Sequence, residues 1–231
     1  MESNDIYWQQ WEKLLEAAAN IQQLFPEAVL AGGSAAAVHL HQRYSFDADH
    51  LFSRLENNYE AVLDFLENRD DWKTARLYPP KLILGNFQGV ETGIRQLRRN
   101  IPLDTETRNV HGRQLTVPTI PEMVRIKGWM IVCRNAARDY IDFAALVEHA
   151  GLAQSVSALA RFDECYLDLI RGPEASPMVQ LIRQLAEPNP YDLDDIDVSQ
   201  YKGIRTPYSS WDHIRHVCEK MAAELGNRLA E

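Results

Sequence analysis

The stretch from Ala28 to Phe52 constrains this chain most, because it combines a paired-glycine turn with two closely spaced aspartates. It reads AVLAGGSAAAVHLHQRYSFDADHLF. The apolar run 28–31 predicts a short buried strand, and the small residues 35–41 predict a helix with Ser34 at its N-cap. Glycines at such a turn let a ligand approach the main chain, and the helix start offers unpaired N–H groups to an anion. A Gly-Gly turn alone also occurs in proteins that bind no phosphate.

Asp47 and Asp49 alternate with the apolar residues Phe46 and Ala48. This alternation places both carboxylates on one face of a strand. Two like charges so close together are costly unless a cation lies between them, and carboxylate oxygens favour a hard ion such as Mg²⁺. The alternative is a solvent-facing edge strand, in which paired aspartates are unfavourable.

The same stretch resembles the GG(S/T) to R-x-S-x-D-x-D signature of the nucleotidyltransferase superfamily that includes DNA polymerase β. It is similar in particular to the AbiEii-type nucleotidyltransferases of bacterial toxin–antitoxin systems. The matching positions are Gly32, Gly33, Ser34, Arg43, Ser45, Asp47 and Asp49. The resemblance implies that the first five of these bind a nucleotide and that the two aspartates hold the catalytic metal. His50 departs from the apolar residue usual at its position, either as an ordinary strand-end histidine or as a change in metal geometry.

The segments Lys81 to Phe87 and Val90 to Leu97 predict two further strands joined by a glycine-containing turn. The resemblance implies a third catalytic carboxylate on a strand beside the two aspartates. Glu91 is the best-placed candidate and Asp104 is the runner-up, although Glu91 is also interpretable as a solvated strand residue. With a third carboxylate, the site would hold two Mg²⁺ ions and use an NTP as substrate.

A second block, 117–146, resembles the AbiEii-type pattern of a proline-led helix bearing a lysine and followed by R-D-x-x-D. By this match Lys127 contacts a nucleotide phosphate, the alternative being a surface lysine. Arg138, Asp139 and Asp142 are supporting residues. The two aspartates lie three apart on one helical face, where they either pair with basic residues or position the second substrate.

The predicted fold is α+β, with a small mixed-sheet nucleotidyltransferase catalytic domain over 1–117. A helical domain over 118–231 is expected to complete the nucleotide cleft. Apolar residues at three-and-four spacing predict helices over 5–24 and 211–229. The net charge of −9 argues against a protein that coats nucleic acid with its whole surface. The segment from Arg95 to Arg138, however, contains nine basic residues and only three acidic ones. This excess indicates either a solvated surface or a ligand-binding region.

The predicted function is metal-dependent transfer of an NMP from an NTP to an acceptor, either RNA such as tRNA or a protein. A toxin–antitoxin role would add a cognate antitoxin as a partner. The alternative is a catalytically reduced nucleotide-binding or toxin–antitoxin interaction protein. The sequence has no apolar run long enough to span a membrane and no secretory pattern at its start, so we expect a cytoplasmic protein without a membrane partner. Three scattered cysteines predict neither disulfides nor a zinc site.

Overall fold

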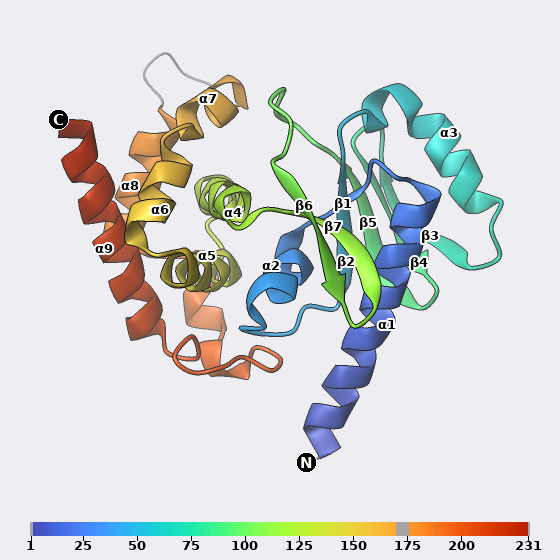
Figure 1. The fold of residues 1–231 in the computed structure, drawn as a ribbon, viewed down its shortest axis with the longest axis horizontal. Coiled ribbons are helices and arrows are strands. Elements are labelled where there is room, and N and C mark those ends of the chain that lie inside the picture. The colour runs from blue at the N-terminus through green and yellow to red at the C-terminus, as the bar shows by residue number, and fades with distance from the viewer. Residues whose placement is uncertain (1, 170–175, 231) are drawn as a thin grey trace. The chain divides into compact units, whose positions relative to one another are not determined.

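The computed structural model describes residues 2–169 and 176–230. The chain divides into two compact units, one formed by Met1–Val38 with Tyr44–Pro118 and the other by His39–Arg43 with Thr119–Glu231. The first unit contains a mixed sheet and the second is helical (Figure 1). The predicted α+β class, with a mixed sheet followed by helices, is therefore confirmed.

The first unit is built around a five-stranded sheet. Its elements are α1 (Glu2–Leu24), β1 (Val29–Leu30), α2 (Gly32–Leu40), β2 (Asp47–Phe52), α3 (Leu55–Glu67), β3 (Trp72–Tyr78), β4 (Leu82–Phe87), β5 (Val90–Gln96), β6 (Thr105–Val110) and β7 (Arg113–Pro118). The strand order is β1-β2-β5-β4-β3, while β6 and β7 form a separate pair. Only the pairing of β2 with β5 is parallel among the described strands.

One face of this sheet lies against the core of the first unit. Along β2, Ala48, His50 and Phe52 are fully buried and alternate with more exposed residues. Helix α1 packs against β2 and β5, and α3 packs against β3 and β5. The ring of Phe25 lies 5.4 Å from that of Phe52. Because successive side chains of a strand point to opposite faces, Asp47 and Asp49 point away from this core.

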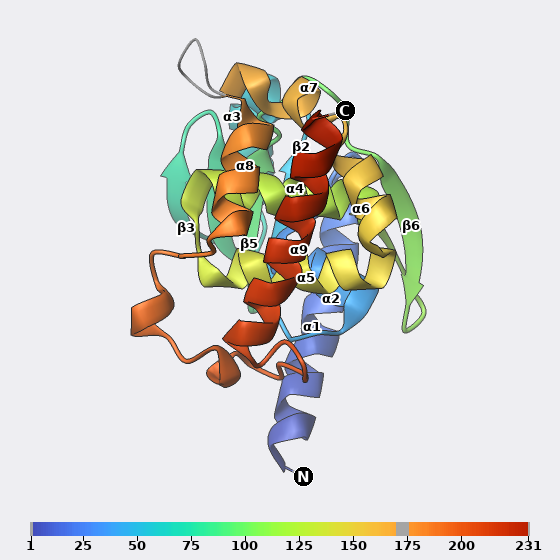
Figure 2. The ribbon, with the colours of Figure 1, turned by 90° about the vertical axis from the view of Figure 1, so that its left-hand side faces the viewer.

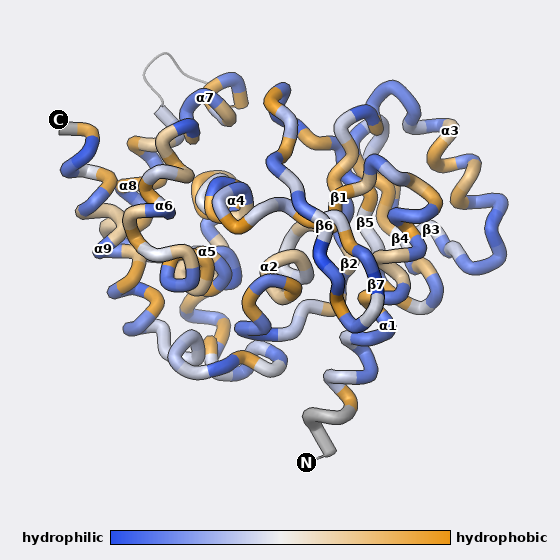
Figure 3. Tube along the Cα trace, viewed as in Figure 1, coloured by the Kyte–Doolittle hydropathy of each residue, from blue (hydrophilic) through white to orange (hydrophobic). Residues whose placement is uncertain are grey.

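The β6–β7 hairpin is attached to α1 by polar contacts. Arg113 donates to Glu12 and to Glu16, each at 2.8 Å. Gln22 exchanges two hydrogen bonds of 2.8 Å with the backbone of Thr116. Strand β6 itself is largely hydrophilic (Figure 3). Strand β7, whose Leu115 and Val117 are fully buried, also packs against α1. The hairpin therefore combines apolar packing with side-chain hydrogen bonds and ion pairs.

The second unit consists of helices packed around an apolar interior. They are α4 (Ile120–Arg134), α5 (Ala137–Ala150), α6 (Leu152–Leu159), α7 (Phe162–Tyr166), α8 (Pro177–Ala186) and α9 (Trp211–Ala230), with 3₁₀ turns at Leu167–Leu169, Leu193–Asp195 and Val198–Gln200. Helix α9 packs against α5, α6 and α8 (Figure 2). No helix in the described part of the chain combines the length and apolar character needed to cross a membrane.

Strand β3 was not predicted from the sequence. Its residues, WKTARLY, are mostly exposed, and only Trp72 is buried. The register of β3 against β4 also shifts between Thr74 and Arg76. Strands are recognised in a sequence by polar and apolar residues that alternate at every second position. A register shift interrupts this alternation, so the sequence of β3 does not show it.

His50 belongs to the core and faces away from Asp47 and Asp49. Its side chain is fully buried, and its Nδ1 donates to the carbonyl of Ala48 at 3.1 Å. Burial lowers the pKa of His50 to about 4. The histidine is therefore a neutral core residue at neutral pH, which supports its interpretation as an ordinary strand residue.

The burial of His50 predicts that the protein loses stability as the pH falls from about 6.5 to about 4. In this window the unfolded chain binds a proton at His50 and the folded chain does not, so protons favour unfolding. The full loss is about 3 kcal/mol. Urea denaturation between pH 4 and pH 8 should show a shallower dependence for His50→Leu than for the wild type. The exposed His216→Leu is the matched control, and an unchanged profile in His50→Leu would contradict the prediction.

Candidate active site

Asp47, Asp49 and Glu91 lie on one face of the sheet. The parallel register pairs Asp47 with Glu91 and Asp49 with Gly93. Side chains of directly paired residues project from the same face of a sheet. Asp47 and Glu91 are exposed, and the side chain of Asp49 retains 30% of its exposure. The other candidate for the third carboxylate, Asp104, lies in the loop before β6.

The position of Asp49 depends on two residues of β5. Arg95 donates from Nε to Asp49 Oδ1 at 2.9 Å. A Cβ atom added to Gly93 would lie 2.1 Å from the same oxygen. Real Cβ atoms do not approach an oxygen so closely, so the Asp49 carboxylate occupies space that only glycine leaves open. This glycine was not singled out from the sequence, because its partner becomes visible only once the strands are paired.

The start of α2 lies beside Asp49. Gly32 has a φ of +71°, and a Cβ placed on it would lie 3.6 Å from Asp49 Oδ2. The N–H of Ala35 bonds back to the carbonyl of Ala31 at 3.4 Å. The N–H groups of Gly32, Gly33 and Ser34 come before this bond, so the helix offers them no acceptor of its own. Together with the helix dipole, they form an anion-binding position next to a carboxylate.

Ser34 does not cap this helix, contrary to the prediction. Helix α2 already begins at Gly32, and the buried Ser34 hydroxyl donates to the backbone carbonyl of Asp47 at 2.6 Å. The hydroxyl thus fixes the first turn of α2 to the start of β2. Ser45, which was also predicted to bind the nucleotide, is half-buried in the segment that precedes β2.

The donor atoms around Asp47 are of the kind that Mg²⁺ prefers, although they are not gathered into a closed cage. Among the residues that the structure describes, no group of three or more His, Cys, Asp or Glu side chains is placed to hold a metal ion. Mg²⁺ is commonly bound through one or two carboxylates, with substrate phosphates and water completing its shell. Asp47 and Asp49, with Glu91 adjacent, fit this mode of binding.

Arg43 and Lys127, predicted to bind the nucleotide, both contact Asp142 inside the second unit. Arg43 donates to the two oxygens of Asp142 at 2.9 and 2.8 Å, and Gln42 donates to Oδ1 at 2.9 Å. Lys127 Nζ lies 2.7 Å from Asp142 Oδ2. Side-chain exposure is 8% for Arg43, 2% for Lys127 and 0% for Asp142. These contacts also explain why residues 39–43 group with the second unit, which the sequence did not predict.

Asp139 extends this buried cluster. It is 3.3 Å from Lys127 Nζ and accepts two hydrogen bonds from Arg134, at 2.5 and 2.7 Å. Burial would raise the pKa of Asp139, but Lys127 and Arg134 outweigh it and hold the pKa below its usual value. Asp142 follows the same rule: burial opposes ionisation, whereas Arg43 and Lys127 hold its pKa well below the usual range.

The cluster shows that Asp139 and Asp142 pair with basic side chains. Arg138, predicted as their supporting neighbour, is exposed, and the pairing falls to other residues, including Arg134 and Gln42, which the sequence did not indicate. The phosphate contacts of Arg43 and Lys127 stay predictions. Either contact would require a buried cation to give up a carboxylate partner.

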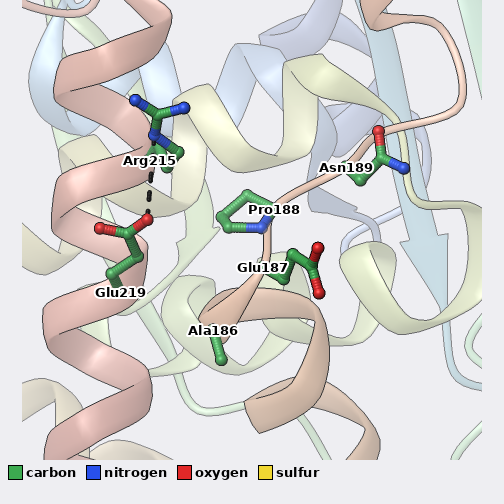
Figure 4. Close-up of a pocket in the computed structure, with 6 residues that line it drawn as sticks. All are labelled: Ala186, Glu187, Pro188, Asn189, Arg215 and Glu219. Carbon is green, nitrogen blue, oxygen red and sulfur yellow. Dashed lines mark ion pairs between the residues drawn. The ribbon is translucent and has the colours of Figure 1, made fainter.

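A pocket of about 470 Å³ lies elsewhere in the second unit (Figure 4). It is lined by Ala186, Glu187, Pro188, Asn189, Arg215 and Glu219. The guanidinium of Arg215 already lies 2.7 Å from Asp212 and 3.8 Å from Glu219. None of the predicted site residues lines this pocket, and its only cation is paired with carboxylates, so its chemistry does not suit a phosphate.

Comparison with known proteins gives partial likenesses. No model of a known protein family matches the chain. It is 33% identical over 124 residues to the mycolic acid-containing lipids exporter MmpL11 of Mycolicibacterium smegmatis. The aligned region covers 52% of this chain and 12% of that protein. It is 34% identical over 131 residues to the heme uptake protein MmpL11 of Mycobacterium tuberculosis, covering 55% of this chain and 13% of that protein. The chain thus spans only about an eighth of the length of these relatives.

Two solved structures align with much of the chain at low sequence identity. A nucleotidyltransferase candidate from H. pylori is 15% identical, with a TM-score of 0.49 over 99% of this chain and 96% of that one. An antigenic nucleotidyltransferase-like protein from Paracoccidioides brasiliensis is also 15% identical, with a TM-score of 0.47 over 68% of this chain and 90% of that one. Similarity at this level assigns no activity, so the roles of Asp47 and Asp49 depend on their own geometry.

Replacing Gly93 by alanine should displace the Asp49 carboxylate and break its hydrogen bond with Arg95. The added methyl group would collide with Oδ1, which is the end of a part-exposed side chain, so the carboxylate should turn away with little loss of stability. A crystal structure and a thermal denaturation curve of Gly93→Ala would test both effects. Gly226→Ala is the matched control, because nothing lies within 4 Å of the added atom there. An undisturbed Asp49–Arg95 pair in Gly93→Ala would contradict the prediction.

Replacing Asp142 by asparagine should lower the free energy of unfolding by about 3–5 kcal/mol, because Arg43 and Lys127 would stay buried without their shared anion. Urea denaturation at pH 7 measures the change. Asp212→Asn, which removes an exposed partner of Arg215, is the control and should have little effect. If Asp142→Asn lowers the free energy of unfolding as little as the control does, the buried cluster does not depend on the negative charge of Asp142.

Proposed function

We propose that this protein transfers an NMP from an NTP to the hydroxyl group of an acceptor, with Mg²⁺ as cofactor. The observation that carries the proposal is the position of Asp49 beside the first turn of α2, with Asp47 on the same sheet face. Carboxylates and an anion-binding helix start, side by side, suit a metal-bound triphosphate better than either feature would alone.

Each residue has a defined role in the proposal. Asp47 and Asp49 would hold the metal bound to the triphosphate, and Glu91, opposite Asp47, would help to hold a second ion. The N–H groups of Gly33 and Ser34 would bind the β- and γ-phosphates. The hydroxyl of Ser34 would act indirectly, by fixing α2 to β2.

In the proposed reaction, the acceptor hydroxyl oxygen forms a bond to the α-phosphorus. The bond from this phosphorus to the oxygen that bridges to the β-phosphate breaks, pyrophosphate leaves, and the hydroxyl proton passes to solvent. Bound Mg²⁺ would supply the Lewis acidity that activates the hydroxyl and stabilises the leaving oxygen. Asp47, Asp49 and Glu91 would hold the metal ions on one face of the sheet, where the triphosphate and the acceptor hydroxyl would meet.

Arg43 and Lys127 would contribute to nucleotide binding only after rearrangement. Both side chains are now buried against Asp142. Binding of a phosphate by Lys127 would require its ammonium to give up Asp142 and Asp139. The toxin role and a cognate antitoxin partner are further parts of the proposal, motivated by the resemblance of the two sequence blocks.

A second candidate is a nucleotide-binding protein that interacts in a toxin–antitoxin pair without catalysing transfer. Two observations favour it. No metal-holding group of three side chains is found within residues 2–169 and 176–230, and Asp49 is paired with Arg95. Such a protein would bind an NTP without requiring Mg²⁺ and would release no pyrophosphate.

Pyrophosphate release and label transfer from each α-labelled NTP, with Mg²⁺ and cell extract as acceptor source, test the first candidate. Asp47→Asn and Asp49→Asn should each lower transfer at least about a hundredfold, because they remove charge that neutralises the metal and triphosphate. Asp64→Asn, a substitution on the exposed face of α3, is the matched control.

Calorimetry with the same NTPs separates the candidates. Tight NTP binding that requires Mg²⁺ and is weakened in Asp49→Asn supports the transferase. Mg²⁺-independent binding without pyrophosphate release supports the second candidate. Full transfer by Asp47→Asn and Asp49→Asn would exclude the proposed site.

A further inference from the structure

The register shift in β3 changes which of its side chains share a face. Lys73 and Arg76 are three residues apart, so in a regular strand they would point to opposite faces. Across the shift, Lys73 pairs with Asn86 and Arg76 pairs with Leu84, which are two residues apart on β4. Both basic side chains therefore project from the same face of the sheet.

This face is the one that carries the candidate active site. Following the register across the sheet, one row contains Lys73, Asn86, Glu91 and Asp47, and the next contains Arg76, Leu84, Gly93 and Asp49. Tyr78 lies in the third row, with Leu82 and Arg95. From β2 to β3 there are three strand spacings, or about 14 Å.

The side chains on this part of β3 are available to a ligand. Lys73 and Arg76 are exposed, and neither is in an ion pair with any described residue. The ring of Tyr78 is 63% exposed. An exposed aromatic ring on the same face as two cations offers a partner both a stacking surface and positive charge.

The surrounding segment is strongly basic in an otherwise acidic protein. Between Lys73 and Arg99 there are six basic residues and one acidic residue, Glu91, giving a net charge of +5 against −9 for the whole chain. The segment that contains β3, β4 and β5 thus carries a local excess of positive charge, including Lys73 and Arg76 on β3. A polyanion would be attracted to this part of the surface and repelled from much of the rest.

We infer that Lys73, Arg76 and Tyr78 bind the acceptor, and that the acceptor is a single-stranded nucleic acid. This inference rests on the proposed nucleotidyl transfer. Lys73 and Arg76 contact backbone phosphates, and a base stacks on the ring of Tyr78, the combination by which single strands are bound without sequence preference. The strand then runs across the sheet face, so that its terminal hydroxyl reaches the nucleotide at Asp47 and Asp49.

A nucleic acid fits these side chains better than a protein acceptor does. An acidic protein segment would use the two cations but would leave the aromatic ring without a specific role. Stacking requires a flat π-system, which every base provides. The spacing between the β3 cations and the aspartates also favours an extended ligand over a single NTP, because the proposed site for the NTP is at the start of α2.

Fluorescence anisotropy with a labelled single-stranded RNA of about a dozen nucleotides tests the inference, using the whole chain without NTP. The double variant Lys73→Ala, Arg76→Ala should weaken binding about tenfold. It should also lower the slope of log affinity against log salt by about 1.4, which corresponds to two single-strand phosphate contacts. Tyr78→Ala should weaken binding about tenfold with the salt slope unchanged.

Lys220→Ala, which removes an exposed cation on α9, is the matched control and should leave affinity unchanged. Wild-type protein that does not bind the RNA, or β3 variants that bind as tightly as the control, would overturn the inference. Asp47→Asn separates it from the proposed function, because this variant should bind RNA and fail to transfer. If a protein becomes labelled instead, and the β3 variants label it as well as the wild type does, the inference is wrong while the proposed transfer stands.

Discussion

The parallel pairing of β2 with β5 is the interaction on which the candidate site depends. It sets Glu91 opposite Asp47 and sets Gly93 beneath the carboxylate of Asp49. Parallel neighbours require a crossover connection, which α3, β3 and β4 provide between the two strands. The pairings of β5 with β4 and of β4 with β3 then continue the same face to Lys73 and Arg76. The registers of three strand pairs therefore place the carboxylates and the basic residues of β3 on one face.

The first turn of α2 is fixed to this arrangement by short-range contacts. The Ser34 hydroxyl binds the carbonyl of Asp47, and the N–H of Ala31 binds the carbonyl of Asp49 at 2.8 Å. The start of α2 is therefore fixed relative to the same two residues whose carboxylates project from the sheet. A phosphate held at the helix start and a cation held by the aspartates would be neighbours without further rearrangement of the backbone.

The second unit uses charge differently, because the ion pairs around Asp142 lie in its interior. Asp142 and Asp139 satisfy Arg43, Lys127 and Arg134 through several short contacts, which offset the cost of removing these groups from water. From the sequence pattern R-D-x-x-D, the two aspartates were predicted either to pair with basic residues or to position a second substrate, with Arg138 as a supporting neighbour. In the structure they contact Arg43, Lys127 and Arg134, whereas Arg138 is exposed.

By itself, the sequence determined the class of fold, the alternation of Asp47 and Asp49 along one strand, and the small-residue helix that precedes them. These features follow from local periodicity and glycine chemistry, which operate over a few residues. Only the tertiary structure decided that Glu91 faces Asp47, that Gly93 makes room for Asp49, and that Lys73 and Arg76 share their face. The reason is that strand order and register are set by pairing between distant segments, and a shift of one residue reverses the face of every side chain that follows.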